Sequence, residues 1–192
     1  MIIILIIIIL IIWKIRIIKF SSSMKKNNLY DIAYELGVNY LNIIKNMDIP
    51  NPTVMFDIDD TLLYVNEDHT LTPIKSIIKL LNYCLKHKFK VLILTARDSS
   101  GTAHTQRELS KFGINYDYLY LRNSPHDDYP TFKSDIKKMY LDHYNLHTVM
   151  SVGDNDIDIN GEYSGYGIKL PNKTDPRLFH INAYGHLENV IP

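Results

Sequence analysis

Three carboxylates within four residues follow an apolar run in the first third of the chain. Asp57, Asp59 and Asp60 come directly after Val54 and Phe56, whose side chains a strand would bury. Like charges repel, and burying them costs free energy unless a cation or hydrogen bonds compensate. The simplest explanation is a divalent-cation site in which one carboxylate is left to react. In open α/β sheets, ligands bind beyond the carboxyl ends of the strands, where these acids lie.

Three later segments carry polar side chains in comparable positions. Each polar group ends an apolar run or begins a predicted helix, and the groups are Thr95 and Arg97, Lys133, and Asp154 with Asp158. The carboxyl ends of parallel strands meet at one edge of a sheet, so the groups that end strands are expected at the same edge as the first three acids.

In this order, the four segments resemble the motifs of the haloacid dehalogenase (HAD) superfamily of phosphohydrolases, over residues from about 53 to 171. The Asp-x-Asp-x-Thr pattern at Asp57 is fairly specific alone, and the threonine, lysine and Gly-Asp elements gain weight from their order. The resemblance implies a phosphatase. It also implies a three-layer Rossmann-like fold, with a central parallel sheet and helices on both faces.

The resemblance assigns a role to each motif residue. Asp57 is expected to be the nucleophile that forms an aspartyl-phosphate, and Asp59 the general acid/base. Thr95 and Lys133 are expected to bind the phosphoryl group. Apart from the resemblance, Arg97 and Arg122 lie just past strand ends, and from that position they could bind substrate.

A metal site is implied at the same edge. Its expected ligands are hard oxygens, which favour Mg²⁺, and they come from Asp57, Asp59 through its backbone carbonyl, Asp154 and Asp158. Asp156 lies between the last two acids and is expected outside the direct ligands, although the sequence leaves open whether Asp156 or Asp158 is closer to the metal.

Each assignment has a structural alternative. Thr95 could cap the turn after its strand, and Lys133 could be an exposed helix lysine. Arg97 could form a salt bridge with a surface acid. Asp154 and Asp158 could serve as helix N-caps, because acids are favoured at helix starts.

Strand and helix patterns alternate along the chain, which predicts a parallel sheet with right-handed crossovers. Strands are expected at residues 53–58, 90–95, 118–121, 148–152 and 166–170, and helices at 28–47, 74–85, 102–112 and 134–144. Asn28 is expected to cap the first helix, which Gly37 could divide in two, and Thr72 to cap the second. Residues 63–72 and 123–131 are expected to be loops, too short for a cap domain, so the site should be open.

The composition is that of a globular protein of 192 residues, with 46% hydrophobic and 22% charged residues. The formal net charge of +0 argues against sequence-independent nucleic-acid binding, which needs a basic face. Cys84 is the single cysteine, so no internal disulfide can form, and a reducing compartment is favoured.

Residues 1–26 form an apolar leader ahead of a phosphatase domain expected over residues 27–192. The apolar run at 2–13 is shorter than the roughly 20 residues that span a bilayer, and Lys14 and Arg16 follow it. The leader is either a membrane anchor through residues 2–20 or a misassigned extension before Met24. The expected location is cytoplasmic in both cases, with membrane association in the first.

Several functions remain open at this point. The leading expectation is a Mg²⁺-dependent phosphatase acting on a phosphorylated substrate of undefined class. The alternatives are a polynucleotide-end 3′-phosphatase, which Thr95, Arg97 and Arg122 faintly resemble, and a non-catalytic binding module on a HAD scaffold. A faint likeness to secreted acid phosphatases is opposed by the poor signal peptide. A membrane-tethered adaptor would rest on residues 2–13 alone. The sequence leaves the oligomeric state open.

Overall fold

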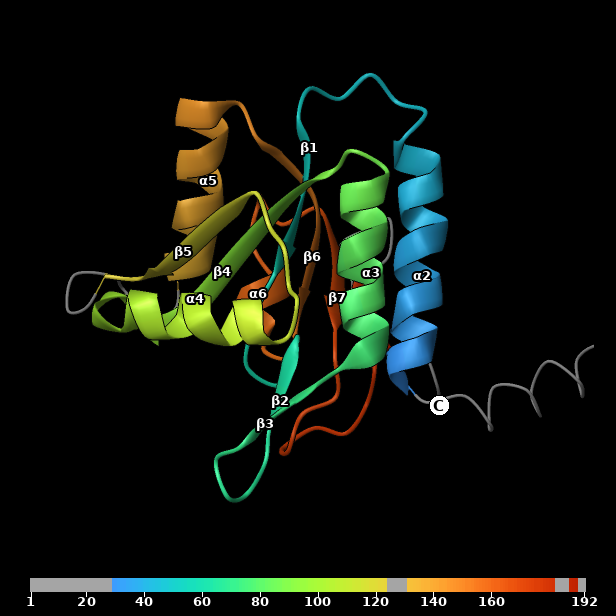
Figure 1. Ribbon diagram of the computed structural model, residues 1–192. Coiled ribbons are helices and arrows are strands. Elements are labelled where there is room, and N and C mark those ends of the chain that lie inside the picture. The colour runs from blue at the N-terminus through green and yellow to red at the C-terminus, as the bar shows by residue number, and fades with distance from the viewer. Residues whose placement is uncertain (1–28, 124–130, 182–186, 190–192) are drawn as a thin grey trace, which may run out of the picture.

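The computed structural model describes residues 29–123, 131–181 and 187–189 (Figure 1). The expectations for the apolar leader and for Asn28 lie outside these residues, as does most of the predicted loop at 123–131. In the described ranges, no helix has the length and hydropathy needed to cross a membrane.

A seven-stranded sheet forms the centre of the described molecule, in the order β5-β4-β1-β6-β7-β8-β9. The strands are β1 (Pro52–Phe56), β4 (Lys90–Asp98), β5 (Tyr118–Arg122), β6 (His147–Gly153), β7 (Tyr166–Lys169), β8 (Phe179–Ile181) and β9 (Leu187–Asn189). The first five of these run parallel, as expected, and β8 and β9 pair antiparallel at one edge. The sequence analysis did not include these two edge strands.

Helices cover both faces of the sheet and complete the expected three layers (Figure 1). They are α2 (Leu29–Ile44), α3 (Lys75–Lys86), α4 (Thr102–Lys111), α5 (Phe132–Tyr144), the short α6 (Asp156–Ile159) and the 3₁₀ turn η1 (Ser99–Gly101). Alternate residues of the strands point to opposite faces. Val54 and Phe56 pack with α2 and α3, whereas Met55 packs against α5 through Phe132 and Ile136.

The first helix is continuous through Gly37, so the division considered from the sequence does not occur. A Cβ added at Gly37 would lie 2.7 Å from Cδ2 of Leu80 on α3. The glycine therefore permits α2 and α3 to approach closely, a benefit that offsets its low helix propensity.

Residues 63–73 contain a β-hairpin, which corrects the expectation of a plain loop. Strands β2 (Leu63–Val65) and β3 (Leu71–Pro73) pair antiparallel. Thr72 lies in β3 and its hydroxyl accepts a hydrogen bond from the Asn66 side chain at 2.9 Å, so it does not cap α3. Ile74 precedes the first residue of that helix instead. The hairpin is far smaller than a cap domain, in agreement with an open site.

Candidate active site

The candidate site lies at the carboxyl edge of three adjacent strands. Strand β1 is central, with β4 on one side and β6 on the other. Asp57 follows β1 directly, Thr95 lies near the end of β4, and Asp154 follows β6. The backbone N–H of Asp57 donates to the Val152 carbonyl at 3.0 Å, which continues the ladder one residue past β1. Parallel pairing therefore brings together residues that are far apart in the sequence.

Three carboxylates form the core of the site. Each of Asp57, Asp154 and Asp158 offers an oxygen, and these oxygens all lie within 4.8 Å of one another. All three residues are buried, with exposed fractions of 6%, 5% and 1%. Such a group is unfavourable without positive charge and could hold a metal ion. The side chain of Asp59, the fourth expected metal residue, does not belong to this group; the sequence analysis had assigned only its backbone carbonyl to the metal.

Lys133 supplies the positive charge that these carboxylates need. It lies in the first turn of α5 and is only 2% exposed, so it is not the exposed helix lysine of the alternative interpretation. Its ammonium donates to Asp57 Oδ1 at 2.6 Å and also contacts Asp158 Oδ1. Although burial lowers the pKa of Lys133, the Asp57 and Asp158 carboxylates raise it above the ordinary value, which keeps the ammonium charged.

One ammonium does not neutralise three buried carboxylates, and the pKa values of the acids reflect this. Burial raises the pKa of Asp57 to about 7; Lys133 opposes the rise and Asp158 adds to it. Burial also raises the pKa of Asp154 to about 6, with a further contribution from Asp158. A divalent cation among these oxygens would reverse both shifts, because it favours the ionised form.

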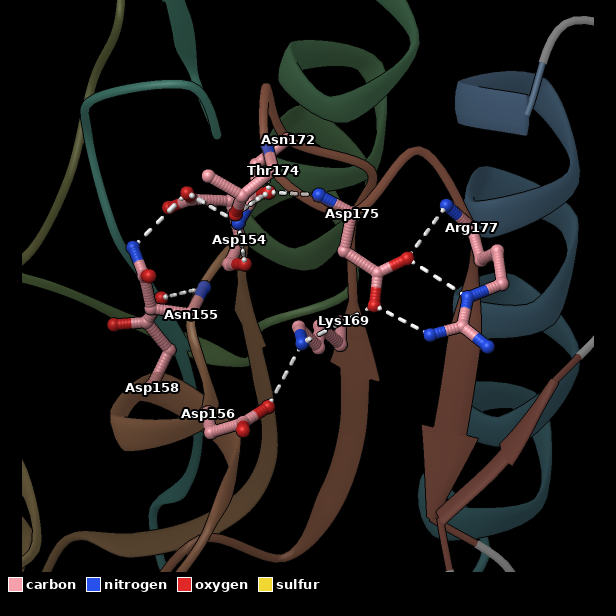
Figure 2. Close-up of polar contacts among 9 residues, drawn as sticks. All are labelled: Asp154, Asn155, Asp156, Asp158, Lys169, Asn172, Thr174, Asp175 and Arg177. Carbon is pink, nitrogen blue, oxygen red and sulfur yellow. Dashed lines mark hydrogen bonds and ion pairs between the residues drawn. The ribbon is translucent and has the colours of Figure 1, made fainter.

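The turn from β6 into α6 places Asp158 in the cluster. Asp158 Oδ2 accepts the backbone N–H of Asn155 at 2.9 Å as part of a capping box. Asp158 therefore takes part in capping, but the N-cap of α6 is Asn155 and neither of the two acids considered from the sequence. Its other oxygen contacts Lys133. A Cβ added at Gly153 would lie 2.1 Å from Asp158 Oδ2, so only glycine leaves room for this carboxylate. Asp156 points away from the cluster and pairs with Lys169 at 2.9 Å (Figure 2).

Asn172 holds Asp154 from the loop after β7, a contact that the sequence analysis did not include. Its amide donates to the Asp154 carbonyl at 2.8 Å and to Asp154 Oδ2 at 3.3 Å (Figure 2). Its own oxygen accepts from the Thr174 and Asp175 backbone N–H groups and from the Thr174 hydroxyl. Asn172 thus orders its own loop and orients an acid of the cluster.

Asp59 is held differently from Asp57. Its two oxygens accept a two-bond fork from Arg97, with Nε at 2.8 Å and Nη2 at 2.6 Å. The remaining Arg97 nitrogen, Nη1, donates to Glu108 on α4 at 2.6 Å. Arg97 therefore contacts acids, as its structural alternative anticipated. One of these acids is the expected general acid/base, so the arginine is also part of the site.

Two further polar groups complete the surroundings. Thr95 is buried beside the cluster, and its hydroxyl also accepts the Arg97 backbone N–H at 3.3 Å, so the turn-capping alternative describes part of its role. Lys137, one turn after Lys133 on α5, is fully buried and donates to the Asp158 carbonyl at 3.0 Å. Burial lowers the pKa of Lys137 to about 7. Lys137 was not predicted from the sequence, and its position on the same helix face as Lys133 was the available signal.

A family comparison agrees with this geometry. Residues 64–175 match the family described as HAD superfamily, subfamily IIIB (Acid phosphatase). The chain belongs to this family. This family is one of acid phosphatases within the HAD superfamily, which is the superfamily that the resemblance implied. The matched residues begin after Asp57 and Asp59, so the family match does not include these two acids. Their assignment to the site rests on the structure, in which Asp57 directly follows β1.

Solved structures agree on the fold. One match is "The structure of the Class C acid phosphatase from Bacillus anthracis", with 18% identity and a TM-score of 0.56 over 69% of this chain and 64% of that chain. Another is "Structure of Pnkp1/Rnl/Hen1 complex", with 19% identity and a TM-score of 0.54 over 64% of this chain and 47% of that chain. The chain thus spans less than two thirds of either structure. No curated protein sequence matches it.

Proposed function

We propose that the protein is a Mg²⁺-dependent phosphatase that cleaves phosphate monoesters through an aspartyl-phosphate on Asp57. The observation that carries the proposal is the buried cluster of Asp57, Asp154 and Asp158 joined by Lys133. A structural acid needs no such crowding, which costs free energy in the absence of a reaction or a cation. Family membership supports the class of reaction.

The residues divide the reaction into two displacements. An Asp57 oxygen attacks phosphorus, the bond from phosphorus to the leaving oxygen breaks, and Asp59 gives that oxygen its proton. The Asp59 carboxylate then takes a proton from water as the water oxygen attacks phosphorus. The bond to Asp57 breaks, phosphate leaves, and both acids return to their starting states.

Lys133 and Thr95 act on the phosphoryl group. The Lys133 ammonium lies 2.6 Å from Asp57 Oδ1, so it sits beside the phosphoryl oxygens as they arrive and screens their charge from the nucleophile. Thr95 lines the same cavity and offers a hydroxyl donor. The Arg97 fork sets the direction of Asp59, and each Asp59 oxygen keeps a lone pair that can take a proton from water.

The three clustered carboxylates fit a magnesium ion, because all their donors are hard oxygens and their mutual repulsion favours a cation. Asp57, Asp154 and Asp158 would hold it, with the Asp59 carbonyl as a further donor. When bound, the ion neutralises charge between the nucleophile and the phosphate.

The test is phosphate release from p-nitrophenyl phosphate with Mg²⁺. Asp57→Asn should abolish turnover and keep the fold, since it removes the nucleophile and changes little volume. Asp142→Asn is the matched control, because Asp142 is an exposed acid on α5 that pairs only with Lys138 among the described contacts. Acid quenching of a labelled substrate should trap phosphate on the native protein. Substantial turnover by Asp57→Asn would disprove the nucleophile, and full activity in EDTA would disprove the metal requirement.

The same assay separates the alternatives. A non-catalytic binding module would bind the phosphate ester without releasing p-nitrophenol or phosphate. A polynucleotide-end phosphatase would prefer oligonucleotide 3′-phosphates over small esters; the neutral net charge argues against this preference.

A further inference from the structure

A second cavity adjoins the catalytic cavity. The catalytic cavity has a volume of about 340 Å³ and is lined by the acidic cluster, Lys133 and Thr95. The second cavity has about 360 Å³ and lies between the hairpin β2–β3 and the segment that leads into α4. Asp59 and Arg97 line both cavities. They therefore lie at the boundary that the two cavities share.

This position makes the second cavity the place for the leaving alcohol. Under the proposed function, on which this inference rests, Asp59 protonates the leaving oxygen. That oxygen must lie within hydrogen-bond reach of the Asp59 carboxylate. With the phosphoryl group at Asp57 and Lys133, the rest of the substrate extends past Asp59, and the adjoining cavity receives it.

The charges that line the second cavity disfavour a substrate that carries a negative group besides its phosphate. Its described lining includes the carboxylates of Asp59, Asp98 and Glu108, and Arg97 is the one guanidinium there, with no lysine. All three guanidinium nitrogens of Arg97 already donate hydrogen bonds, two of them to Asp59 and one to Glu108. An anionic ligand would have to displace these carboxylates or lie beside them.

The remaining lining favours hydroxyl or ammonium groups. His69 and His104 lie at the rim, and the His104 ring is 3.1 Å from a Glu108 oxygen. Ser100 and Thr105 contribute hydroxyls, and Val65 provides an apolar surface. The side chain of Ser100 and its backbone N–H, which Asp98 accepts at 2.9 Å, lower the pKa of Asp98 with the help of Arg122, so Asp98 stays ionised.

We infer that the second cavity is a leaving-group subsite that selects phosphomonoesters of uncharged or cationic alcohols and rejects substrates with a second negative group. Like charges repel, and the repulsion is several-fold stronger at the effective dielectric near a protein surface than in bulk water. While Asp59 carries the proton for the leaving oxygen, Asp98 and Glu108 still face the substrate beside one engaged guanidinium, which is sufficient for measurable discrimination.

The experiment uses two substrates that share a skeleton. Glycerol 3-phosphate and 3-phosphoglycerate differ only in a hydroxymethyl group replaced by a carboxylate. With native protein and Mg²⁺, kcat/KM should be at least about tenfold higher for glycerol 3-phosphate, and phosphoethanolamine should be hydrolysed at least as well as glycerol 3-phosphate. An oligonucleotide 3′-phosphate, with its neighbouring phosphodiester, should be a poor substrate. Equal or reversed preference overturns the subsite, and preference for the oligonucleotide would favour the polynucleotide-end alternative.

Two variants locate the discrimination. Asp98→Asn and Glu108→Gln each remove one lining charge and should reduce the ratio between the two substrates several-fold, whereas Asp142→Asn on α5 should leave the ratio unchanged. A ratio unaffected by both cavity variants overturns the assignment. The native ratio should also shrink as salt rises, because partly exposed charges are screened. If no phosphomonoester is hydrolysed, including p-nitrophenyl phosphate, the proposed function fails, which is a distinct result from loss of discrimination alone.

Discussion

The two aspartates of the first motif are two residues apart, yet their surroundings differ. Asp57 is buried and bonded to a lysine, whereas the Asp59 side chain is 40% exposed and bonded to an arginine fork. A nucleophile benefits from a fixed position beside the phosphoryl group. An acid/base must instead exchange protons with the leaving oxygen and with water, which requires exposure. The proposed roles follow this difference.

Asp59→Asn should slow turnover by about 10²–10⁴-fold on an alkyl phosphate, whose leaving group needs a proton. Metal affinity should change little, because the variant keeps the backbone carbonyl expected at the metal. Steady-state kcat and calorimetric Mg²⁺ titration measure the two effects. A loss of less than a few-fold in kcat would show that Asp59 is not the acid/base.

Asn172→Ala should weaken Mg²⁺ binding by about 10- to 100-fold, the usual effect of removing a group that orients a metal ligand. It removes two hydrogen bonds to Asp154. Thr174→Val is the matched control, because it removes a bond to Asn172 and leaves Asp154 untouched. Calorimetric titration should separate the two variants. Equal affinities would mean that Asn172 orders only its own loop.

At the scale of elements, the segment from β6 to α6 positions two of the three clustered carboxylates, Asp154 and Asp158. Gly153 ends the strand, Asp154 follows it, and Asp158 returns to the cluster from a helix of four residues. The short helix is stabilised by its capping box with Asn155 as N-cap. Because Asp158 packs against the Gly153 Cα, any side chain at position 153 moves a carboxylate of the cluster.

Gly153→Ala should therefore reduce both stability and metal binding. Overpacking of this kind costs about 1–3 kcal/mol, and displacement of Asp158 should raise the dissociation constant for Mg²⁺. Gly101→Ala is the control, because an added Cβ there meets nothing within 4 Å. Urea unfolding and metal titration of both variants are the measurements. A Gly153→Ala protein with native Mg²⁺ affinity would contradict the close packing.

At the scale of the whole molecule, the cluster links stability to pH. The pKa values of Asp57 and Asp154 are raised to about 7 and about 6, above the 3.8 of an ordinary aspartate. Between pH 3.8 and about pH 7, the folded metal-free protein binds more protons at these two aspartates than the unfolded chain does. Its free energy of unfolding should therefore fall as pH rises from about 5 to about 7. Lys137, with its pKa lowered to about 7, acts in the opposite sense above that range.

Urea unfolding at pH 5, 6 and 7, with and without Mg²⁺, tests this linkage. Magnesium should stabilise the protein more at pH 7 than at pH 5, because protons compete for the same oxygens. Asp57→Asn should flatten the metal-free slope. A metal-free protein that gains stability between pH 5 and 7 would contradict the burial of uncompensated carboxylates.

A chain shortened to begin at Met24 should fold and hydrolyse phosphate monoesters like the full chain. The described fold begins with α2 at Leu29, and all residues of the site lie later in the sequence. Thermal unfolding and kcat/KM of the two chains give the comparison. Loss of either property would show that the leader packs on the domain, and membrane sedimentation of the full chain alone would favour an anchor.

The motif residues were recognisable because they follow strands, and local patterns identify strands well. An apolar run that ends in acids or hydroxyls specifies both the strand and the side of the sheet where its polar end lies. Asp57, Thr95 and Asp154 could therefore be assigned to one edge of the sheet from the sequence alone. The alternation of strands and helices likewise predicted the parallel sheet and the three layers, and Lys133 was placed at the start of its helix.

Contacts between distant segments required the tertiary structure. The pairing of Arg97 with Asp59 and Glu108 and the hydrogen bonds from Asn172 to Asp154 join residues that no local period connects. The hairpin at 63–73 escaped notice because its strands have three residues each, too few to show an alternating pattern. The second cavity depends on this hairpin and on the segment leading into α4, which meet only in the folded chain. Sequence thus determines which groups are available, whereas packing decides which charges each group meets.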